Sequence, residues 1–379
     1  MKKYDVTIIG GGPAGTTAAL YLNKQGFSVC IIEKKLFPRE TLCGEFLSHE
    51  VTAILKDLNL FEDFLDLNPN PIKSFKLYGK DGSFIETALN FAAYGMKRGR
   101  FDCFLLDHAR MHGVDVFQPC EVKELSKNGN DHCVLIDEGS SKFQIFSKRL
   151  IAAYGKQNIL DKKLKRAFTG TATGFNGIKF HLPLSIFKKI ETGAIHIIAS
   201  KGLYCGMNVV ERESVTVCFL ENRESSKDNA RRRLILLIQS NKAMTDLFGA
   251  SFENAITEAQ LYGTGNIFFG PKELVQDGVF MIGDSAAVIA PVAGDGIGMA
   301  MQSAKLISEV FDLQGRNGLS DDMTEKLYIK RWNKTFKPRL RTALFLQTNL
   351  LSTPMMSVGF RILKFFPHLV QGLVKATRA

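Results

Sequence analysis

The stretch that decides the fold is YDVTIIGGGPAG, which spans Tyr4 to Gly15. Its first half, residues 4–9, is a short β-branched run that predicts a buried strand. A helix is predicted over residues 16–23, and a second strand over residues 28–32 ends in the acid Glu33. Between the first strand and the helix, glycines follow the spacing G-x-G-x-x-G, at Gly10, Gly12 and Gly15. Strand, glycine turn, helix, strand and acid in this order predict a dinucleotide-binding βαβ unit.

Each part of this unit has a physical role in holding a dinucleotide. The first glycine permits a tight turn, the second lets the backbone approach a pyrophosphate, and the third lets the helix pack close to the strand. The start of the helix presents free N–H groups and a positive dipole to the phosphates. Glu33 can accept hydrogen bonds from ribose hydroxyls. The residues expected at this end of the cofactor are Gly10, Gly12, Pro13, Ala14, Gly15, Glu33 and Lys34.

A second stretch, GDSAAVIAPVAGDGIGMAM from Gly283 to Met301, suits the other end of a long cofactor. Its acid can accept a hydrogen bond from a ribityl hydroxyl, its proline can form a wall beside a flavin ring, and its glycines let backbone N–H groups approach that ring. The helix predicted to start near Ile297 would point its positive end at a reduced, anionic flavin. A nicotinamide cofactor would leave this stretch unexplained, so we predict FAD. The residues expected at this end are Gly283, Asp284, Pro291, Gly294, Gly296 and Ile297.

Together the motifs resemble those of the FAD-dependent superfamily that contains the aromatic hydroxylases of the p-hydroxybenzoate hydroxylase type and the geranylgeranyl reductases. RGRFD at residues 98–102 resembles the R-x-x-F-D helix of this superfamily, which implies that Arg98 lies near FAD. LCG at residues 42–44 resembles the cysteine–glycine turn of the reductase branch. That resemblance implies that Cys43 and Gly44 line the flavin and the substrate.

The same resemblance implies that Tyr204 and Cys205 line the substrate pocket. Arg39 is interpreted as a surface-loop arginine. The chain departs from the hydroxylases at Tyr154, which stands before a glycine where they usually carry an aspartate, and this departure bears on their usual handling of NAD(P)H. The motif W-x-W-x-I-P is absent and Trp332 is the only tryptophan, which argues against a tryptophan-halogenase-like activity.

The order of the predicted elements indicates an α/β protein. We expect a discontinuous Rossmann-like FAD-binding domain, an inserted β-sheet substrate domain and a C-terminal helical tail, with FAD lying between the two domains. The FAD-binding domain is assigned to residues 1–71, 97–167 and 271–330, the substrate domain to 72–96 and 168–270, and the tail to 331–379.

The charge of the chain is concentrated in this tail. The net charge is +11, and residues 331–379 carry nine Lys or Arg and no acid. Because apolar runs are mixed with these cations, lipid headgroups are a better partner than nucleic acid. Peripheral membrane contact and amphipathic helices packed on the body both remain open interpretations. Seven scattered cysteines without a C-x-x-C pair favour a reduced, cytoplasmic protein.

The expected chemistry is carried by the flavin, because no convincing acid–base set is present. Cys43 and Glu45 are candidates beside it. His108 and His112 share a helix face without a third ligand, so no metal site is predicted. No second glycine motif follows a strand, so NAD(P)H is expected to bind transiently unless a separate partner reduces the flavin. Nothing in the sequence selects an oligomeric state.

Three functions fit these observations. The first is a monooxygenase that hydroxylates a hydrophobic lipid, aromatic or polyketide-like substrate. The second is a reductase of isoprenoid double bonds, of the geranylgeranyl reductase type. The third is a flavin protein that transfers electrons and has no substrate of its own.

Overall fold

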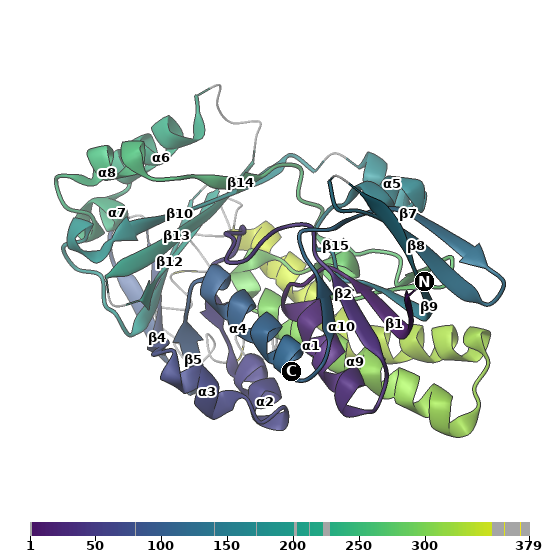
Figure 1. The fold of residues 1–379 in the computed structure, drawn as a ribbon. Helices are drawn as coiled ribbons and strands as arrows, with labels where there is room; N and C mark the ends of the chain where they lie inside the picture. The colour runs from purple at the N-terminus through teal and green to yellow at the C-terminus, as the bar shows by residue number, and fades with distance from the viewer. Residues whose placement is uncertain are drawn as a thin grey trace.

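The computed structural model describes residues 2–79, 81–139, 141–171, 173–200, 203–211, 213–222 and 228–350, with Phe360 and Gly372. Two eight-stranded sheets organise these residues and stand side by side in Figure 1. The α/β architecture predicted from the sequence is confirmed.

The first sheet is built around parallel strands in the order β17-β9-β1-β2-β6. Their side chains are buried on both faces, as β2 shows with the sequence VCII, which is typical of a covered parallel sheet. A short antiparallel edge strand and a hairpin that pairs with β9 complete the sheet. The bounds are β1 Lys2–Ile9, β2 Val29–Ile32, β6 Asp115–Phe117, β7 Glu121–Asn128, β8 Asp131–Asp137, β9 Lys142–Ala152, β16 Val275–Gln276 and β17 Val279–Met281.

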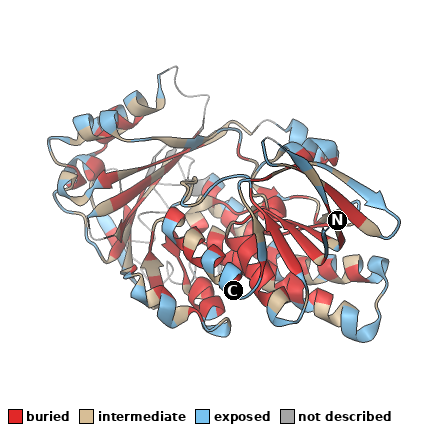
Figure 2. Cartoon of the chain, in the orientation of Figure 1, coloured by how far each residue is buried: buried red, intermediate tan, exposed pale blue. Residues whose placement is uncertain are grey.

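Helices and this sheet enclose the larger of the buried cores. Figure 2 shows the buried residues concentrated in these strands and in the helices packed against them. Helix α1 contacts both α4 and α9, and α9 in turn contacts α2 and α10. The bounds are α1 Pro13–Lys24, α2 His49–Asp57, α3 Phe61–Asp66, α4 Arg98–Met111, α5 Ile159–Lys163, α9 Gly296–Asn317 and α10 Asp321–Leu350.

The second sheet has the order β14-β10-β13-β12-β11-β4-β5-β3 and is antiparallel except where β11 pairs with β4. Helices α6 to α8 cover one face of it and form a second core, at the upper left of Figure 1. The bounds are β3 Phe46–Leu47, β4 Asn70–Tyr78, β5 Phe84–Gly95, β10 Phe175–Pro183, β11 Ala194–Ser200, β12 Leu203–Glu211, β13 Ser214–Asn222, β14 Tyr262–Thr264, α6 Ala230–Ser240, α7 Lys242–Leu247 and α8 Phe252–Glu258. Strand β3 thus belongs to this sheet although its residues were assigned to the FAD-binding domain.

The start of the predicted tail belongs to the body of the protein. Helix α10 continues without a break through residue 331, so the predicted boundary at that residue is wrong. The physical reason is a stripe of buried residues three or four apart that packs into the first core: Tyr328, Trp332, Phe336, Leu340 and Ala343. Most of residues 351–379 lie outside the described chain. Among the described helices, none has both the length and the apolar composition to cross a bilayer.

Candidate functional site

The glycine turn between β1 and α1 has the geometry of a phosphate site. A Cβ added at Gly15 would lie 1.9 Å from the carbonyl oxygen of Gly10, so only glycine lets α1 approach this closely. A Cβ added at Gly12 would meet only the guanidinium nitrogens of Arg39 and Arg98, at 3.6 and 4.0 Å. The backbone at Gly12 therefore faces a space bordered by two cations at the start of α1, which suits a diphosphate.

Glu33, at the end of β2, is buried and held in one orientation. Its Oε2 accepts a hydrogen bond from the backbone N–H of Gly11 at 2.8 Å, and its Oε1 accepts one from the backbone N–H of Lys35 at 2.8 Å. Each carboxylate oxygen has a further lone pair for a ligand hydroxyl. Lys34 is exposed beside it, and both Glu33 and Lys34 line the cavity described below.

The start of α4 and the loop around Arg39 supply the two cations at Gly12. Arg98 donates to both carboxylate oxygens of Asp102, from Nε at 2.7 Å and from Nη2 at 2.9 Å. Arg39 Nη2 lies 3.8 Å from the same carboxylate, and its guanidinium lies over the ring of Phe37 at 4.7 Å. Arg39 lines the cavity, so its interpretation as a surface-loop arginine is wrong. The loop that carries Arg39 packs against α4, and no local sequence pattern predicts this tertiary contact.

The second motif lies directly against the first. Gly283 opens a short 3₁₀ turn, η4 (Gly283–Ser285), and a Cβ added there would lie 2.8 Å from the Cβ of Ala14 in α1. Asp284, the next residue, lines the cavity, and its Oδ2 lies 3.2 Å from Nζ of Lys156. The two stretches that the sequence assigned to opposite ends of one cofactor therefore meet.

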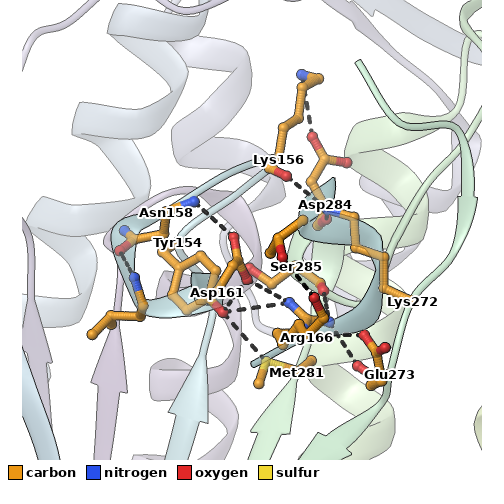
Figure 3. Close-up of polar contacts among 12 residues, drawn as sticks. Tyr154, Lys156, Asn158, Asp161, Arg166, Lys272, Glu273, Met281, Asp284 and Ser285 are labelled. Atoms are coloured by element: carbon orange, nitrogen blue, oxygen red, sulfur yellow. Dashed lines mark hydrogen bonds and ion pairs between the residues drawn. The ribbon is translucent and has the colours of Figure 1, made fainter. Parts of the chain in front are cut away.

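Lys272 supports this junction from behind. Its Nζ donates to the backbone carbonyls of Lys156, at 2.7 Å, and of Asp284, at 2.9 Å (Figure 3). Burial lowers the pKa of Lys272 to about 8, and the nearby charge of Asp284 only partly opposes this. Sequence reasoning missed both lysines, because neither stands in a motif.

Tyr154, which replaces the usual aspartate, takes part in a buried network that Figure 3 shows. Its hydroxyl donates to Oδ1 of Asp161 at 2.7 Å, and Arg166 donates to the same oxygen at 2.7 Å. Arg166 also donates to the backbone carbonyls of Ser285, at 2.8 Å, and Glu273, at 2.7 Å. Burial raises the pKa of the Tyr154 phenol, which keeps it protonated. Tyr154, through Asp161 and Arg166, thus links the loop after β9 to Ser285 in the second motif.

The loop expected at the flavin ring has the predicted form. Pro291 opens the 3₁₀ turn η5 (Pro291–Ala293), Gly294 follows in the left-handed conformation with φ +60°, and α9 starts at Gly296, one residue before the predicted start at Ile297. Across this loop, Nη2 of Arg339 in α10 lies 3.5 Å from Oδ2 of the buried Asp295.

One cavity of about 820 Å³ joins both motifs. Its lining includes both the glycine turn and the start of α9, which fits a cofactor with a diphosphate at one end and a ring at the other. The predicted residues that line it are Gly10, Gly12, Pro13, Ala14, Glu33, Lys34, Cys43, Gly44, Glu45, Arg98, Tyr204, Asp284, Pro291, Gly294, Gly296 and Ile297. Gly15 and Gly283 pack behind this lining instead.

The second sheet forms the opposite wall of the cavity. Along β12, Tyr204, Gly206 and Asn208 line the cavity, whereas Cys205 and Met207 are buried in the core under α6 to α8. The prediction that Cys205 lines the substrate pocket is therefore wrong, because alternate side chains of a strand point to opposite faces. Burial also raises the pKa of the Cys205 thiol, which keeps it unreactive.

Glu45, the candidate acid, is the centre of a buried charge cluster. Its Oε1 accepts from the backbone N–H of Arg98 at 2.8 Å and from Nζ of Lys179 at 2.6 Å. Its Oε2 lies 2.6 Å from Nε2 of His181 and accepts a hydrogen bond from Thr216. Burial opposes ionisation, but the hydrogen bond from His181 and the charge of Lys179 outweigh it and lower the pKa of Glu45 to about 2. Glu45 therefore has no proton to donate near neutral pH.

Glu40, Glu45 and His181 also place potential metal-ligand atoms within 4.8 Å of one another. The ammonium group of Lys179 contacts both carboxylates of this group, at 2.5 Å from Glu40 and 2.6 Å from Glu45. A side-chain cation thus already stands where the acids would hold an ion, and we interpret the group as an internally neutralised cluster.

Comparison with known proteins agrees with this geometry. A model of the family described as FAD binding domain matches residues 3–312. The chain belongs to that family. This FAD-binding protein is 24% identical to the 1H-pyrrole-2-carbonyl-(peptidyl-carrier protein) chlorinase of Pseudomonas fluorescens, over 80% of this chain and 75% of that protein. It is 24% identical to digeranylgeranylglycerophospholipid reductase 1 of Methanococcoides burtonii, over 92% of this chain and 84% of that protein.

The fold of this FAD-binding protein is shared with p-nitrophenol 4-monooxygenase of Pseudomonas putida, whose solved structure aligns with a TM-score of 0.80 at 16% identity and covers 100% of both chains. The resemblance stated from the sequence is thereby confirmed. The protein is an FAD-dependent oxidoreductase and an enzyme, so the hypothesis of an electron-transfer protein without a substrate is wrong. FAD supplies two-electron redox chemistry when it is bound.

Proposed function

We propose that this enzyme is a monooxygenase that inserts one oxygen atom into a neutral, largely apolar substrate. The observation that carries the proposal is the composition of the cavity wall formed by the second sheet. Among the described lining residues of β4, β5 and β10 to β14, none is charged: Phe75, Leu77, Tyr78, Leu89, Gly177, Ile195, Ile197, Tyr204, Gly206, Asn208, Cys218, Phe219, Leu220 and Thr264. An apolar wall facing the cofactor motifs suits a hydrophobic substrate held over the flavin.

The proposed reaction consumes one O₂, two electrons and two protons for each substrate molecule. One oxygen atom enters a C–H bond as a hydroxyl group, and the other leaves as water. NAD(P)H is the proposed source of the electrons, either by transient binding or through a separate flavin reductase. The described chain contributes the shielded cavity, the cations at Gly12 and the α9 N-terminus, whose positive end favours a negatively charged ring.

Two other outcomes start from the same site. Similarity to the pyrrole-carrier chlorinase supports halogenation, in which oxygen activation serves to oxidise a halide. Similarity to the archaeal lipid reductase, together with Cys43 and Gly44 in the cavity lining, supports hydride transfer to an isoprenoid double bond. Hydroxylation remains the main proposal on the ground of the uncharged second-sheet wall, which suits a hydrophobic substrate.

Oxygen uptake by the FAD-loaded protein separates these outcomes. The protein is supplied with NADPH, or with NADH and a separate flavin reductase, and a neutral lipid extract, with and without bromide. Substrate-stimulated oxygen uptake with a product heavier by one oxygen atom supports hydroxylation. A brominated product that needs bromide replaces hydroxylation by halogenation, and anaerobic turnover with a product heavier by two hydrogens replaces it by reduction. Absence of any substrate-stimulated uptake contradicts the proposal.

We also propose that the C-terminal residues contact a membrane surface. Near the end of the described part of α10, Phe345 is 65% exposed and is among the residues that line the same cavity. Flotation of the protein with anionic phospholipid vesicles, compared with a form truncated after residue 350, tests this contact. Equal flotation of the two forms would count against it.

A further inference from the structure

Asn208 has a side-chain amide donor, Nδ2, that is without a hydrogen-bond partner among the described residues. It lies on β12, between Met207 and Val209, which are both buried in the core under α6 to α8. Asn208 therefore points to the other face and lines the cavity. Its side chain is 3% exposed, and its Nδ2 has no hydrogen-bond partner among the described residues. Buried amide donors are nearly always paired, so this exception calls for an acceptor that binds from outside the chain.

The surroundings of Asn208 limit the chemistry of that acceptor. The second-sheet wall offers no charged residue among its described lining residues, and Asn208 is its one amide. Charged residues elsewhere in the cavity lining include paired groups, such as Arg98 with Asp102 and Lys156 with Asp284. A carboxylate ligand would call for a free cation, whereas a neutral oxygen needs only an N–H donor.

The position of Asn208 places this donor where the two domains meet. In the β12–β13 register Asn208 stands opposite Thr216, which donates a hydrogen bond to Glu45. Glu45 also accepts from the backbone N–H of Arg98, at the start of α4. A ligand oxygen held by Asn208 would therefore lie at the edge of the second-sheet wall that adjoins the cofactor motifs.

We propose that Asn208 is the substrate-orienting residue, and that its Nδ2 donates a hydrogen bond to a neutral carbonyl or hydroxyl oxygen of an otherwise apolar substrate. The inference rests on the proposed function only in assigning the second-sheet wall to the substrate. It names the substrate class as neutral molecules with one acceptor oxygen, and it excludes carboxylates and pure hydrocarbons as good ligands. A site built to donate a hydrogen bond discriminates against analogues that lack the acceptor.

Binding of three matched probes to the FAD-loaded protein tests this assignment without turnover. The probes are 2-acetylnaphthalene, which has a neutral carbonyl, 2-isopropenylnaphthalene, which has the same shape without an acceptor, and the anion 2-naphthoate. Their affinities are read from the change in flavin absorbance. We expect the ketone to bind about tenfold more tightly than the hydrocarbon, the size of one net hydrogen bond. In Asn208→Leu, the ketone and the hydrocarbon should bind about equally.

Met207→Leu is the matched control, since it changes the neighbouring residue on the face that does not line the cavity. It should leave the preference for the ketone unchanged. Three results would overturn the proposal: an undiminished preference in Asn208→Leu, tighter binding of 2-naphthoate than of the ketone, or binding of none of the probes.

Thermal unfolding provides a second measurement that separates binding from a structural role. An unpaired buried amide destabilises the free protein, so Asn208→Leu should keep or raise the Tm of the FAD-loaded protein without a probe. A lower Tm would show that Asn208 serves the fold and would contradict the proposal. Loss of oxygen uptake with intact probe preference would reject the monooxygenase function alone, and the reverse pattern would reject Asn208 alone.

Discussion

The carboxylate of Glu45 and the ammonium group of Lys179 lie 2.6 Å apart, and both side chains have 0% exposure. Lys179 is on β10 of the second sheet, whereas Glu45 also accepts a hydrogen bond from the backbone N–H of Arg98 at the N-terminus of α4. This ion pair therefore joins the second sheet to the cofactor-binding part of the chain.

Glu45→Gln should destabilise the protein by about 3–5 kcal/mol at pH 7, because it leaves Lys179 buried without its charged partner. The pKa of Glu45 is lowered to about 2 from an ordinary value of 4.5. Its stabilising contribution is therefore complete above pH 4.5 and is lost as the pH falls through 2. Urea unfolding at pH 7 and pH 3 should show a smaller difference between variant and wild type at pH 3. The exposed pair Asp322–Lys326 provides the control, and Asp322→Asn should have little effect at either pH.

Gly12→Ala should weaken FAD binding at least tenfold while the fold is kept. The added Cβ would meet only two arginine side-chain tips in the protein, but it would occupy the space that faces the diphosphate. Titration of the FAD-free protein with FAD, followed by flavin fluorescence, measures the loss. Gly170→Ala, where a Cβ meets nothing within 4 Å, should bind FAD like the wild type. Unchanged FAD affinity in Gly12→Ala would show that the diphosphate lies elsewhere.

Lys272→Met should accelerate release of FAD, because the carbonyls of Lys156 and Asp284 lose their shared donor. The lowered pKa of Lys272 also predicts that the free energy of unfolding depends on pH. Its pKa is lowered to about 8 from 10.5, so its charged form destabilises the folded state below pH 8, and this penalty disappears as the pH rises to 10.5. Relative to Lys272→Met, the wild type should gain up to about 3 kcal/mol between pH 7 and pH 10.5. Guanidinium unfolding at these pH values checks this, and the exposed Lys162→Met should show no such trend.

Arg339→Met should both destabilise the protein and loosen the loop at the flavin ring. Arg339 lies 3.2 Å from Oε1 of Glu50 and 3.5 Å from Oδ2 of Asp295, and both acids are buried. Removing the guanidinium takes a cation away from two buried carboxylates, which should lower the free energy of unfolding by about 3–5 kcal/mol. Arg341→Met, on the exposed side of the same helix, is the matched control. Equal stability and equal FAD retention in the two variants would contradict the assigned role of Arg339.

The cofactor motifs could be predicted from the sequence because their requirements are local. The turn at Gly10 to Gly15 and the loop before α9 are set by backbone conformations that only a few residue types permit. The buried stripe of α10 was equally present in the sequence, at Tyr328, Trp332 and Phe336, and packing on the body was one of the two interpretations left open for the charged segment that begins at residue 331. The face of β12 could not be predicted, because strand alternation gives two opposite faces and only the packing of α6 to α8 selects between them.

By itself, the sequence determined membership of an FAD-binding family and predicted which short stretches hold the two ends of the cofactor. Only the tertiary structure decided which side chains complete the site. Arg39 at Gly12 and Asn208 in the wall come from segments without a motif, and packing between distant parts of the chain brings them to the cavity. Lys272, also outside any motif, reaches the carbonyl of Asp284 from behind in the same way. The physical reason is that a backbone turn is specified by neighbouring residues, whereas a side chain's environment is specified by whatever the folded chain packs against it.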